Sequence, residues 1–115
     1  MKNTNYMNTF SKYPITSDVE LIDPRKASLY LKCNLANNRP LQNVHLHRMV
    51  QDMINDNFKH LSGSIKFTHD GKLIDGQHRL NAVILSGKAI EFLVLRGFCE
   101  ESAQVIDTGK SRNLT

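Results

Sequence analysis

The feature that most constrains the fold is a change of hydrophobic period within residues 64–87, SIKFTHDGKLIDGQHRLNAVILSG. In its first half apolar and polar residues alternate around an Asp70-Gly71 pair, a pattern typical of two antiparallel strands joined by a tight turn. After Gly76 the apolar residues recur at helical spacing, which predicts a helix ended by Gly87. A chain that passes from a hairpin directly into a helix must build its core from both kinds of element.

The remaining elements are expected on both sides of this segment. Asp23-Pro24 is typical of a helix N-cap followed by proline at the first helical position, and a short alternating strand precedes it. Within the predicted helix of the 64–87 segment, the side chains expected to face inward are Leu80, Val83, Ile84 and Leu85. The other predicted elements are a strand at 18–24, helices at 25–36 and 42–57, a strand at 89–97 whose run FLVL is buried on both faces, and a helix at 100–107.

The order of these elements predicts a single α+β domain, built on a small mixed sheet flanked by helices. The length of 115 residues suits one core. Residues 1–17 are polar and are expected to form a loose arm, so the domain itself is assigned to residues 18–115. The excess of 15 basic over 11 acidic residues gives a formal charge of +4, which permits a polyanionic partner without requiring one.

The two cysteines and the apolar runs indicate the cellular compartment in which the protein is expected to reside. Cys33 and Cys99 lie far apart and outside any CxxC pair, so we expect buried thiols of a cytosolic protein rather than a disulfide or a zinc site. No apolar run reaches membrane-spanning length, and the N-terminal residues lack the apolar stretch of a signal peptide. We therefore expect a cytosolic protein without a membrane partner, in a bacterial cell or in something that replicates inside one.

The residues at the predicted strand-to-helix junction have the chemistry of an anion site. A helix start exposes unpaired N–H groups and partial positive charge, and Gly76 would let a ligand approach the backbone. Gln77 lies in the same turn, and Arg79 offers a planar cationic fork suited to phosphate. His78 could donate to phosphate or move a proton, and Asp75 could hold a divalent metal or orient Arg79.

A purely structural interpretation of the same residues is also available. Asp75 could simply be the helix N-cap, and Arg79 could pair with Asp75 or with Glu91 on the surface. For an isolated Asp-Gly-x-x-Arg sequence this structural interpretation is the favoured one.

The segment DGQHRLNAVILSGKAIEFLVL resembles the second conserved box of the ParB/sulfiredoxin superfamily. The residues that match its pattern are Gly76, Arg79, Ala82 and Gly87, followed by the apolar strand FLVL. The preceding IKFTHDGKLIDG is similar to the hairpin of that superfamily. NRPL (38–41) and DTGKSRN (107–113) resemble segments of small members from phages and mobile elements, so the likeness covers roughly residues 18–113.

This resemblance implies a ParB/sulfiredoxin-like fold and the handling of nucleotides and phosphate. It implies binding of CTP or ATP with a metal such as Mg²⁺, with Gly76 and Arg79 at phosphate-binding positions, and His78-Arg79 also matches the His-Arg pair of sulfiredoxin. From their chemistry, Asp75 and His78 are the candidate catalytic residues, and Asp75 is the candidate metal ligand. The chain departs from the pattern at Gln77, where sulfiredoxin has its reactive cysteine and the chromosome-partition branch has a glutamate. Sulfinic acid reduction is therefore not expected, and hydrolysis would need Asp75 in place of the missing carboxylate. The partition proteins also carry a helix-turn-helix domain, for which we see no room here.

Residues elsewhere in the chain are further candidates for the same site. Lys110 and Thr108 follow the last predicted helix and could bind phosphate, although GK[ST] without the earlier glycines is not a P-loop and a solvated tail is the favoured interpretation. If this tail folds back on Gly76, Asp107 could complete a metal site with Asp75. Arg39, in the proline turn, could reach a ligand or stay on the surface, and both interpretations remain open.

Three functions follow, in order of preference. The first is a nucleotide- and phosphate-binding ParB-like domain of phage or mobile-element origin, which could act as a metal-dependent nucleoside triphosphatase. The second is a DNA-binding protein or nuclease, because the same cradle suits a backbone phosphate. The third is a non-enzymatic phage inhibitor that binds a host defence or secretion complex. The sequence does not reveal the base, turnover or the oligomeric state.

Overall fold

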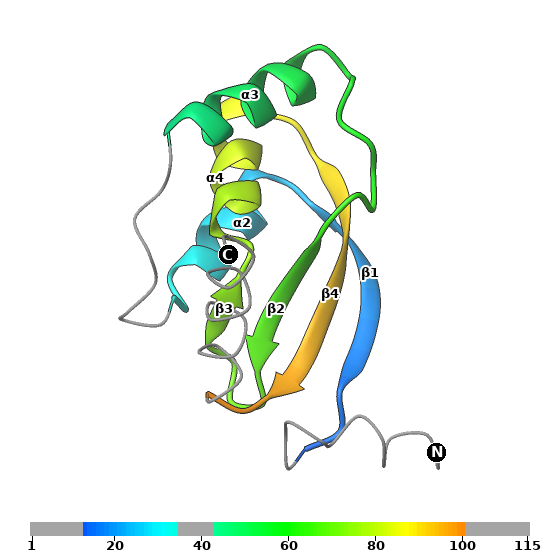
Figure 1. The fold of residues 1–115 in the computed structure, drawn as a ribbon, viewed down its shortest axis with the longest axis vertical. Coiled ribbons are helices and arrows are strands. Elements are labelled where there is room, and N and C mark those ends of the chain that lie inside the picture. The colour runs from blue at the N-terminus through cyan, green and yellow to red at the C-terminus, as the bar shows by residue number, and fades with distance from the viewer. Residues whose placement is uncertain (1–12, 35–42, 101–115) are drawn as a thin grey trace, which may run out of the picture.

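The computed structural model of the protein describes residues 13–34 and 43–100. These residues form three helices and one four-stranded sheet, which confirms the predicted α+β class (Figure 1). The elements are β1 (Thr16–Ile22), α2 (Pro24–Leu31), α3 (Asn43–Ile54), β2 (Ser64–Thr68), β3 (Leu73–Asp75), α4 (Gln77–Ser86) and β4 (Ile90–Phe98).

The sheet is mixed, as the sequence predicts, with the strand order β1-β4-β2-β3. β4 runs antiparallel to β1 and parallel to β2, and β2 and β3 form the antiparallel hairpin. The last strand of the described chain therefore lies between the first two, and α4 makes the crossover that parallel pairing with β2 requires. This crossover places the start of α4 next to the beginning of β2.

The helices cover only one face of the sheet in Figure 1, where α2 and α4 lie on the same side and α3 packs against α4. The buried face includes Phe92 and Val94 of β4. On the other face Leu93 and Leu95 of β4 are only half-buried. The prediction that FLVL is buried on both faces is therefore wrong, because none of the described helices covers the outer face. The core cluster consists of Ile22, Ala27, Met53, Ile65, Phe67, Leu73, Leu80, Ala82, Val83, Ile90, Phe92 and Val94.

The hairpin turn forms where the Asp70-Gly71 pair predicts it. The amide of Thr68 donates to the carbonyl of Lys72 at 2.8 Å, and the amide of Gly71 donates to the carbonyl of Thr68 at 3.0 Å. Gly71 has a φ of +89°, a conformation that favours glycine. The Thr68 hydroxyl donates to the Asp70 carboxylate at 2.5 Å. This first Asp-Gly pair is thus a structural turn.

The predicted helix after the hairpin is confirmed, with one error in its inward face. Gly87 ends α4 in the left-handed conformation, and its amide donates to the carbonyl of Val83 at 3.0 Å. Leu80 and Val83 are fully buried as predicted, and Ile84 is half-buried. Leu85, however, is 62% exposed. Consecutive residues of a helix point in different directions, so Ile84 and Leu85 cannot both face the sheet. Leu85 therefore lies on the solvent side of α4.

The first helix begins as predicted and ends earlier. The Asp23 carboxylate accepts the amide of Lys26 at 2.8 Å, which confirms the N-cap. The helix ends at Leu31 instead of continuing to residue 36. The carbonyl of Cys33 then accepts the amide of Leu73 at 2.7 Å, so this stretch pairs with β3 instead of continuing the helix. Cys33 is exposed, which contradicts the predicted buried thiol; Cys99 is half-buried, and neither of these cysteines forms a disulfide.

Several predictions fall at or beyond the limits of the described chain. β1 begins at Thr16, before the predicted start at residue 18, since Thr16 pairs with Arg96 in β4. Residues 1–12 of the predicted arm and residues 101–107 of the predicted last helix lie outside the described residues.

Within residues 13–34 and 43–100, no helix has the length and apolar character needed to cross a membrane.

Candidate functional site

The junction between β3 and α4 depends on Gly76. This residue has a φ of +115° and precedes the first helical residue, and a Cβ on it would lie 2.7 Å from Cδ1 and 3.3 Å from Cα of Ile65. Both the backbone conformation and the close approach to β2 therefore require glycine. Gly76 lets the chain turn from the sheet edge into α4 while the first helical turn stays against β2.

Arg79 reaches back from that first turn to the edge of the sheet. β3 is shorter than β2, and its last residue pairs with Lys66, so Ser64 lies beyond the paired part of the hairpin. The Nη1 group of Arg79 donates to the carbonyl of Ser64 at 3.0 Å. Within the described part of the chain, no carboxylate pairs with Arg79. A guanidinium has five N–H donors, and this hydrogen bond uses one of them.

Asp75 takes neither role that the structural interpretation gave it. Its carboxylate lies 3.3 Å from Nζ of Lys66, and Gly76 occupies the N-cap position. Glu91, the other predicted partner of Arg79, lies with its carboxylate 4.0 Å from Nδ1 of His60. Both predicted ion pairs of Arg79 are therefore wrong, because Arg79 turns toward the start of β2.

Gln77 and His78 occupy the first two positions of α4 and are half-buried. The carbonyl of Gln77 accepts the side-chain amide of Asn81 at 2.9 Å. The N-cap residue, Gly76, has no side chain that could cap the N-terminal end of α4. The start of a helix carries partial positive charge and therefore favours an anionic partner.

The structure brings together the five consecutive residues that the sequence singles out, 75–79, at one end of α4. The other candidate site residues lie outside the described residues; they are Arg39, Asp107, Thr108 and Lys110. Sequence reasoning missed Lys66, whose pairing with Asp75 follows from the strand register rather than from any motif. It also missed Gly63, whose Cα lies against the side chain of Arg79.

Asp75 is the carboxylate among residues 75–79 that could bind a metal ion. Among residues 13–34 and 43–100, no group of three or more His, Cys, Asp or Glu side chains could hold an ion. Mg²⁺ commonly binds through one or two carboxylates together with the phosphate oxygens of its substrate.

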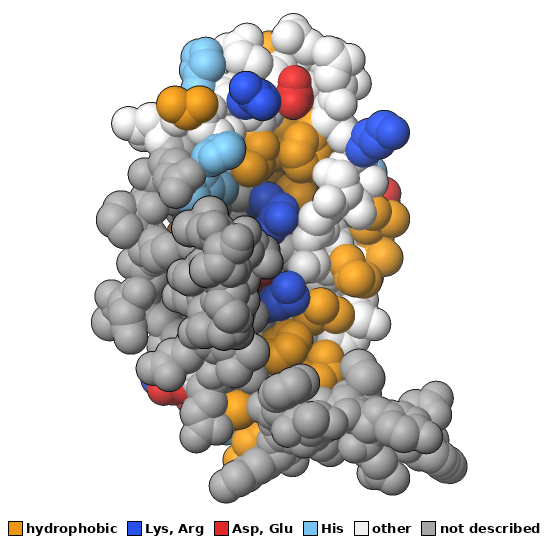
Figure 2. Space-filling model, in the orientation of Figure 1, with side chains coloured by type: hydrophobic (Ala, Val, Ile, Leu, Met, Phe, Trp, Pro, Cys, Tyr) orange, Lys and Arg blue, Asp and Glu red, His pale blue; other side chains and the backbone are white. Residues whose placement is uncertain are grey.

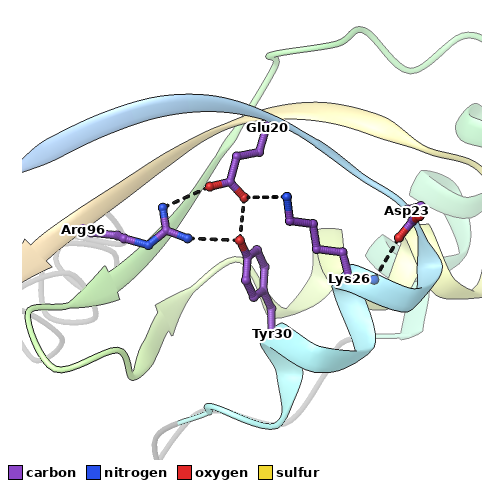
Figure 3. Close-up of polar contacts among 5 residues, drawn as sticks. All are labelled: Glu20, Asp23, Lys26, Tyr30 and Arg96. Carbon is purple, nitrogen blue, oxygen red and sulfur yellow. Dashed lines mark hydrogen bonds and ion pairs between the residues drawn. The ribbon is translucent and has the colours of Figure 1, made fainter.

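A second polar cluster, which the sequence did not reveal, lies between α2 and the sheet (Figure 3). Glu20 accepts hydrogen bonds from the Tyr30 hydroxyl at 2.5 Å and from Nη1 of Arg96 at 3.0 Å, and it lies 3.2 Å from Nζ of Lys26. Nη2 of Arg96 also donates to the Tyr30 hydroxyl at 3.0 Å. The guanidinium carbon of Arg96 lies 5.1 Å from the centre of the Phe67 ring, within cation–π range.

The ionisation of this cluster is set by burial and by its hydrogen bonds. Burial alone would raise the pKa of Glu20, but the hydrogen bonds from Tyr30, Arg96 and Lys26 outweigh it and leave the pKa below its ordinary value. Burial and the hydrogen bond to Glu20 raise the pKa of Tyr30. The cluster thus surrounds one carboxylate with two cations and a hydroxyl, and it ties α2 to β1 and β4.

Comparisons of the chain with protein-family models, with curated proteins and with solved structures give no match.

Proposed function

We propose that the protein binds a nucleoside triphosphate, CTP or ATP, with its phosphates at the start of α4. The observation that carries the proposal is Arg79: it belongs to a helix start whose N-cap is a glycine, the Ser64 carbonyl holds its guanidinium, and no carboxylate of the described residues pairs with it. A planar cation of this kind next to helix N–H groups is a common arrangement for phosphate binding. The resemblance of DGQHR to the ParB/sulfiredoxin box supports the same assignment.

Each residue of the site has a role in this proposal. Arg79 and the amides of the first turn bind phosphate oxygens, and His78 donates a hydrogen bond or moves a proton. Lys66 adds a cation, but Asp75 neutralises it at 3.3 Å, so the charge of the described site is close to that of Arg79 alone. A triphosphate carries several negative charges, which is why we include Mg²⁺ bound to the nucleotide.

Binding is the core of the proposal, and hydrolysis is a further step that the resemblance implies. Gln77 supplies no carboxylate at the position where the partition proteins have one. Asp75 is paired with Lys66, so it would have to leave that partner before it could contact a metal. Turnover therefore requires a rearrangement at Asp75, whereas binding does not.

The proposal is tested by a thermal-shift screen of the four ribonucleoside triphosphates and a short DNA, each with and without Mg²⁺. We expect CTP or ATP with Mg²⁺ to raise the melting temperature, and Arg79→Ala to remove this rise. Arg25→Ala is the matched control, because it removes one exposed arginine from α2 and should leave the rise intact. A melting temperature that no triphosphate changes would contradict the proposal.

The distribution of charge favours a compact anion over a nucleic acid. In Figure 2 the Lys and Arg side chains lie singly among hydrophobic and polar ones and do not gather into one broad basic patch on this face. Nucleic-acid binding usually depends on several clustered phosphate contacts. A larger thermal shift with the short DNA than with any triphosphate would favour the second function instead.

Binding to a host protein complex has a different observation in its favour, the face of the sheet that none of the described helices covers. Val19 and Leu21 on this face are 55% and 58% exposed. Exposed apolar side chains in contiguous strands often mark protein-binding surfaces. Capture of one defined host complex that survives Arg79→Ala and is lost in Leu21→Lys would favour this third function.

A further inference from the structure

We infer that Gly63 is a positioning residue of the proposed phosphate site, because its missing side chain leaves the space that Arg79 occupies. The inference rests on the proposed function for its ligand, but its structural basis is separate. Gly63 immediately precedes β2, sixteen positions before Arg79, and no sequence motif connects the two residues.

The geometry shows a tight contact. A Cβ placed on Gly63 would lie 2.1 Å from Nε, 2.7 Å from Cζ and 2.9 Å from Cδ of Arg79, and real Cβ contacts are essentially never under 3.0 Å. By contrast, a Cβ on Gly71 would meet nothing within 4 Å. The side chain of Arg79 therefore lies directly against the backbone of Gly63, in a place that every other residue type would fill.

Backbone conformation does not explain a glycine at this position. The other glycines in the described part of the chain all have a positive φ, which favours glycine whatever their surroundings; they are Gly71, Gly76, Gly87 and Gly97. Gly63 is absent from this set, so an L-residue could adopt its φ. The contact with Arg79 is consequently the feature of the described structure that requires glycine at position 63.

This contact fixes the position of a flexible cation. A free arginine side chain has many rotamers, and ordering it on binding costs free energy. Here the backbone of Gly63 supports the stem, and the carbonyl of Ser64 holds Nη1 at 3.0 Å. The guanidinium is thereby held next to the first turn of α4 before any ligand arrives. Preorganisation of this kind raises affinity without adding a contact.

The inference predicts that Gly63→Ala weakens ligand binding more than it weakens folding. The new methyl group would meet the far end of a flexible side chain, which can move aside at small cost to the fold. The guanidinium would then leave its position beside α4. We expect the affinity for the nucleotide to fall about tenfold, the order expected when one well-placed ionic contact is lost.

The test is a double-mutant cycle on the full chain, measured by calorimetry with CTP and with ATP, each with Mg²⁺. The variants are Gly63→Ala, Arg79→Ala and the double variant, and Ser62→Ala is the control at a neighbouring exposed position. We expect Ser62→Ala to bind like the wild type. We also expect the double variant to bind no more weakly than Arg79→Ala, because Gly63 acts only through Arg79.

The outcomes separate this inference from the proposed function. If the wild type binds neither nucleotide, the proposed function fails. If the wild type binds and Gly63→Ala binds equally well, or if the two losses add in the double variant, only the role of Gly63 is overturned.

The double variant also covers the case in which Gly63→Ala alone does not fold. The pair Gly63→Ala with Arg79→Ala lacks the Cδ, Nε and Cζ atoms that the new methyl group would meet, so it should fold as stably as Arg79→Ala alone. If this pair also fails to fold, Gly63 is required for a reason other than Arg79, and the inference is wrong.

Discussion

Arg79 and Arg96 carry the same side chain in two very different surroundings. Arg96 donates to the carboxylate of Glu20 and to the hydroxyl of Tyr30, and it lies over the ring of Phe67. Arg79 donates to one main-chain carbonyl and has no carboxylate partner in the described residues. The positive charge of Arg96 is therefore balanced inside the fold, whereas no carboxylate among residues 13–34 and 43–100 balances that of Arg79.

The difference separates a structural arginine from a candidate ligand-binding one. A charge that is fully paired stabilises the fold and has little left for a ligand. A charge that is held in place without a counter-charge is a candidate binding site, because a bound anion would supply the missing counter-charge. The comparison predicts that changes in the Glu20 cluster should act mainly on stability, and changes around Arg79 mainly on ligand binding.

The largest expected effect on stability is that of Glu20→Gln. The change keeps the shape of the side chain but removes the negative charge that three donors share. We expect the free energy of unfolding to fall by about 2 kcal/mol, within the range for hydrogen bonds to charged groups. Urea denaturation measures the change, with Glu91→Gln as the control, since the Glu91 side chain is 47% exposed. An equal loss in both variants would contradict the structural role of the cluster.

The same cluster should make stability depend on pH. The pKa of Glu20 is lowered from 4.5 in the folded state, so the unfolded state takes up protons first as the pH falls. The contribution of Glu20 is therefore fully present above about pH 4.5 and is lost as the pH falls through the lower folded-state pKa. The stability difference between the wild type and Glu20→Gln should be largest near neutral pH and shrink in acid. A difference that stays constant down to pH 3 would show that the charge of Glu20 has no such role.

The comparison also shows why one of these regions could be predicted and the other could not. Residues 75–79 are consecutive, so the sequence alone places them at one strand-to-helix junction. Glu20, Tyr30 and Arg96 come from β1, α2 and β4, and only the register of β1 with β4 brings them together. Nothing in the local sequence of Arg96 indicates a carboxylate partner 76 residues away.

The fold itself followed from local signals wherever such signals exist. The Asp23 cap, the Asp70-Gly71 turn and the Gly87 stop all act within a few residues and were predicted correctly. The errors arose where tertiary contacts decide. α2 ends early because Cys33 pairs with Leu73, and Leu93 is half-buried because the described helices lie on one face of the sheet. The contact between Gly63 and Arg79 is of the same tertiary kind.

A smaller effect on stability is expected for Arg79→Ala in the absence of ligand. The variant loses one hydrogen bond to the Ser64 carbonyl, which lies near the edge of the sheet. We expect the free energy of unfolding to fall by about 1 kcal/mol, the typical value for a single hydrogen bond. Arg96→Ala, measured in the same urea experiment, should lose more, because it breaks several contacts. A larger loss for Arg79→Ala than for Arg96→Ala would reverse the assignment of the two arginines.

The smallest expected effect concerns Asp75, and it distinguishes two roles for this carboxylate. If Asp75 mainly neutralises Lys66, Asp75→Asn releases that cation, and the affinity for pyrophosphate without Mg²⁺ should rise a few-fold, on the order of one partly exposed ion pair. If Asp75 instead contacts the metal, the same variant should weaken nucleotide binding with Mg²⁺ and leave pyrophosphate binding unchanged. Lys66→Met separates the two cases further. It should abolish the gain of Asp75→Asn in the first case and have no influence on the metal-dependent loss in the second. Because the Asp75 carboxylate lies 3.3 Å from Nζ of Lys66, we expect the first result.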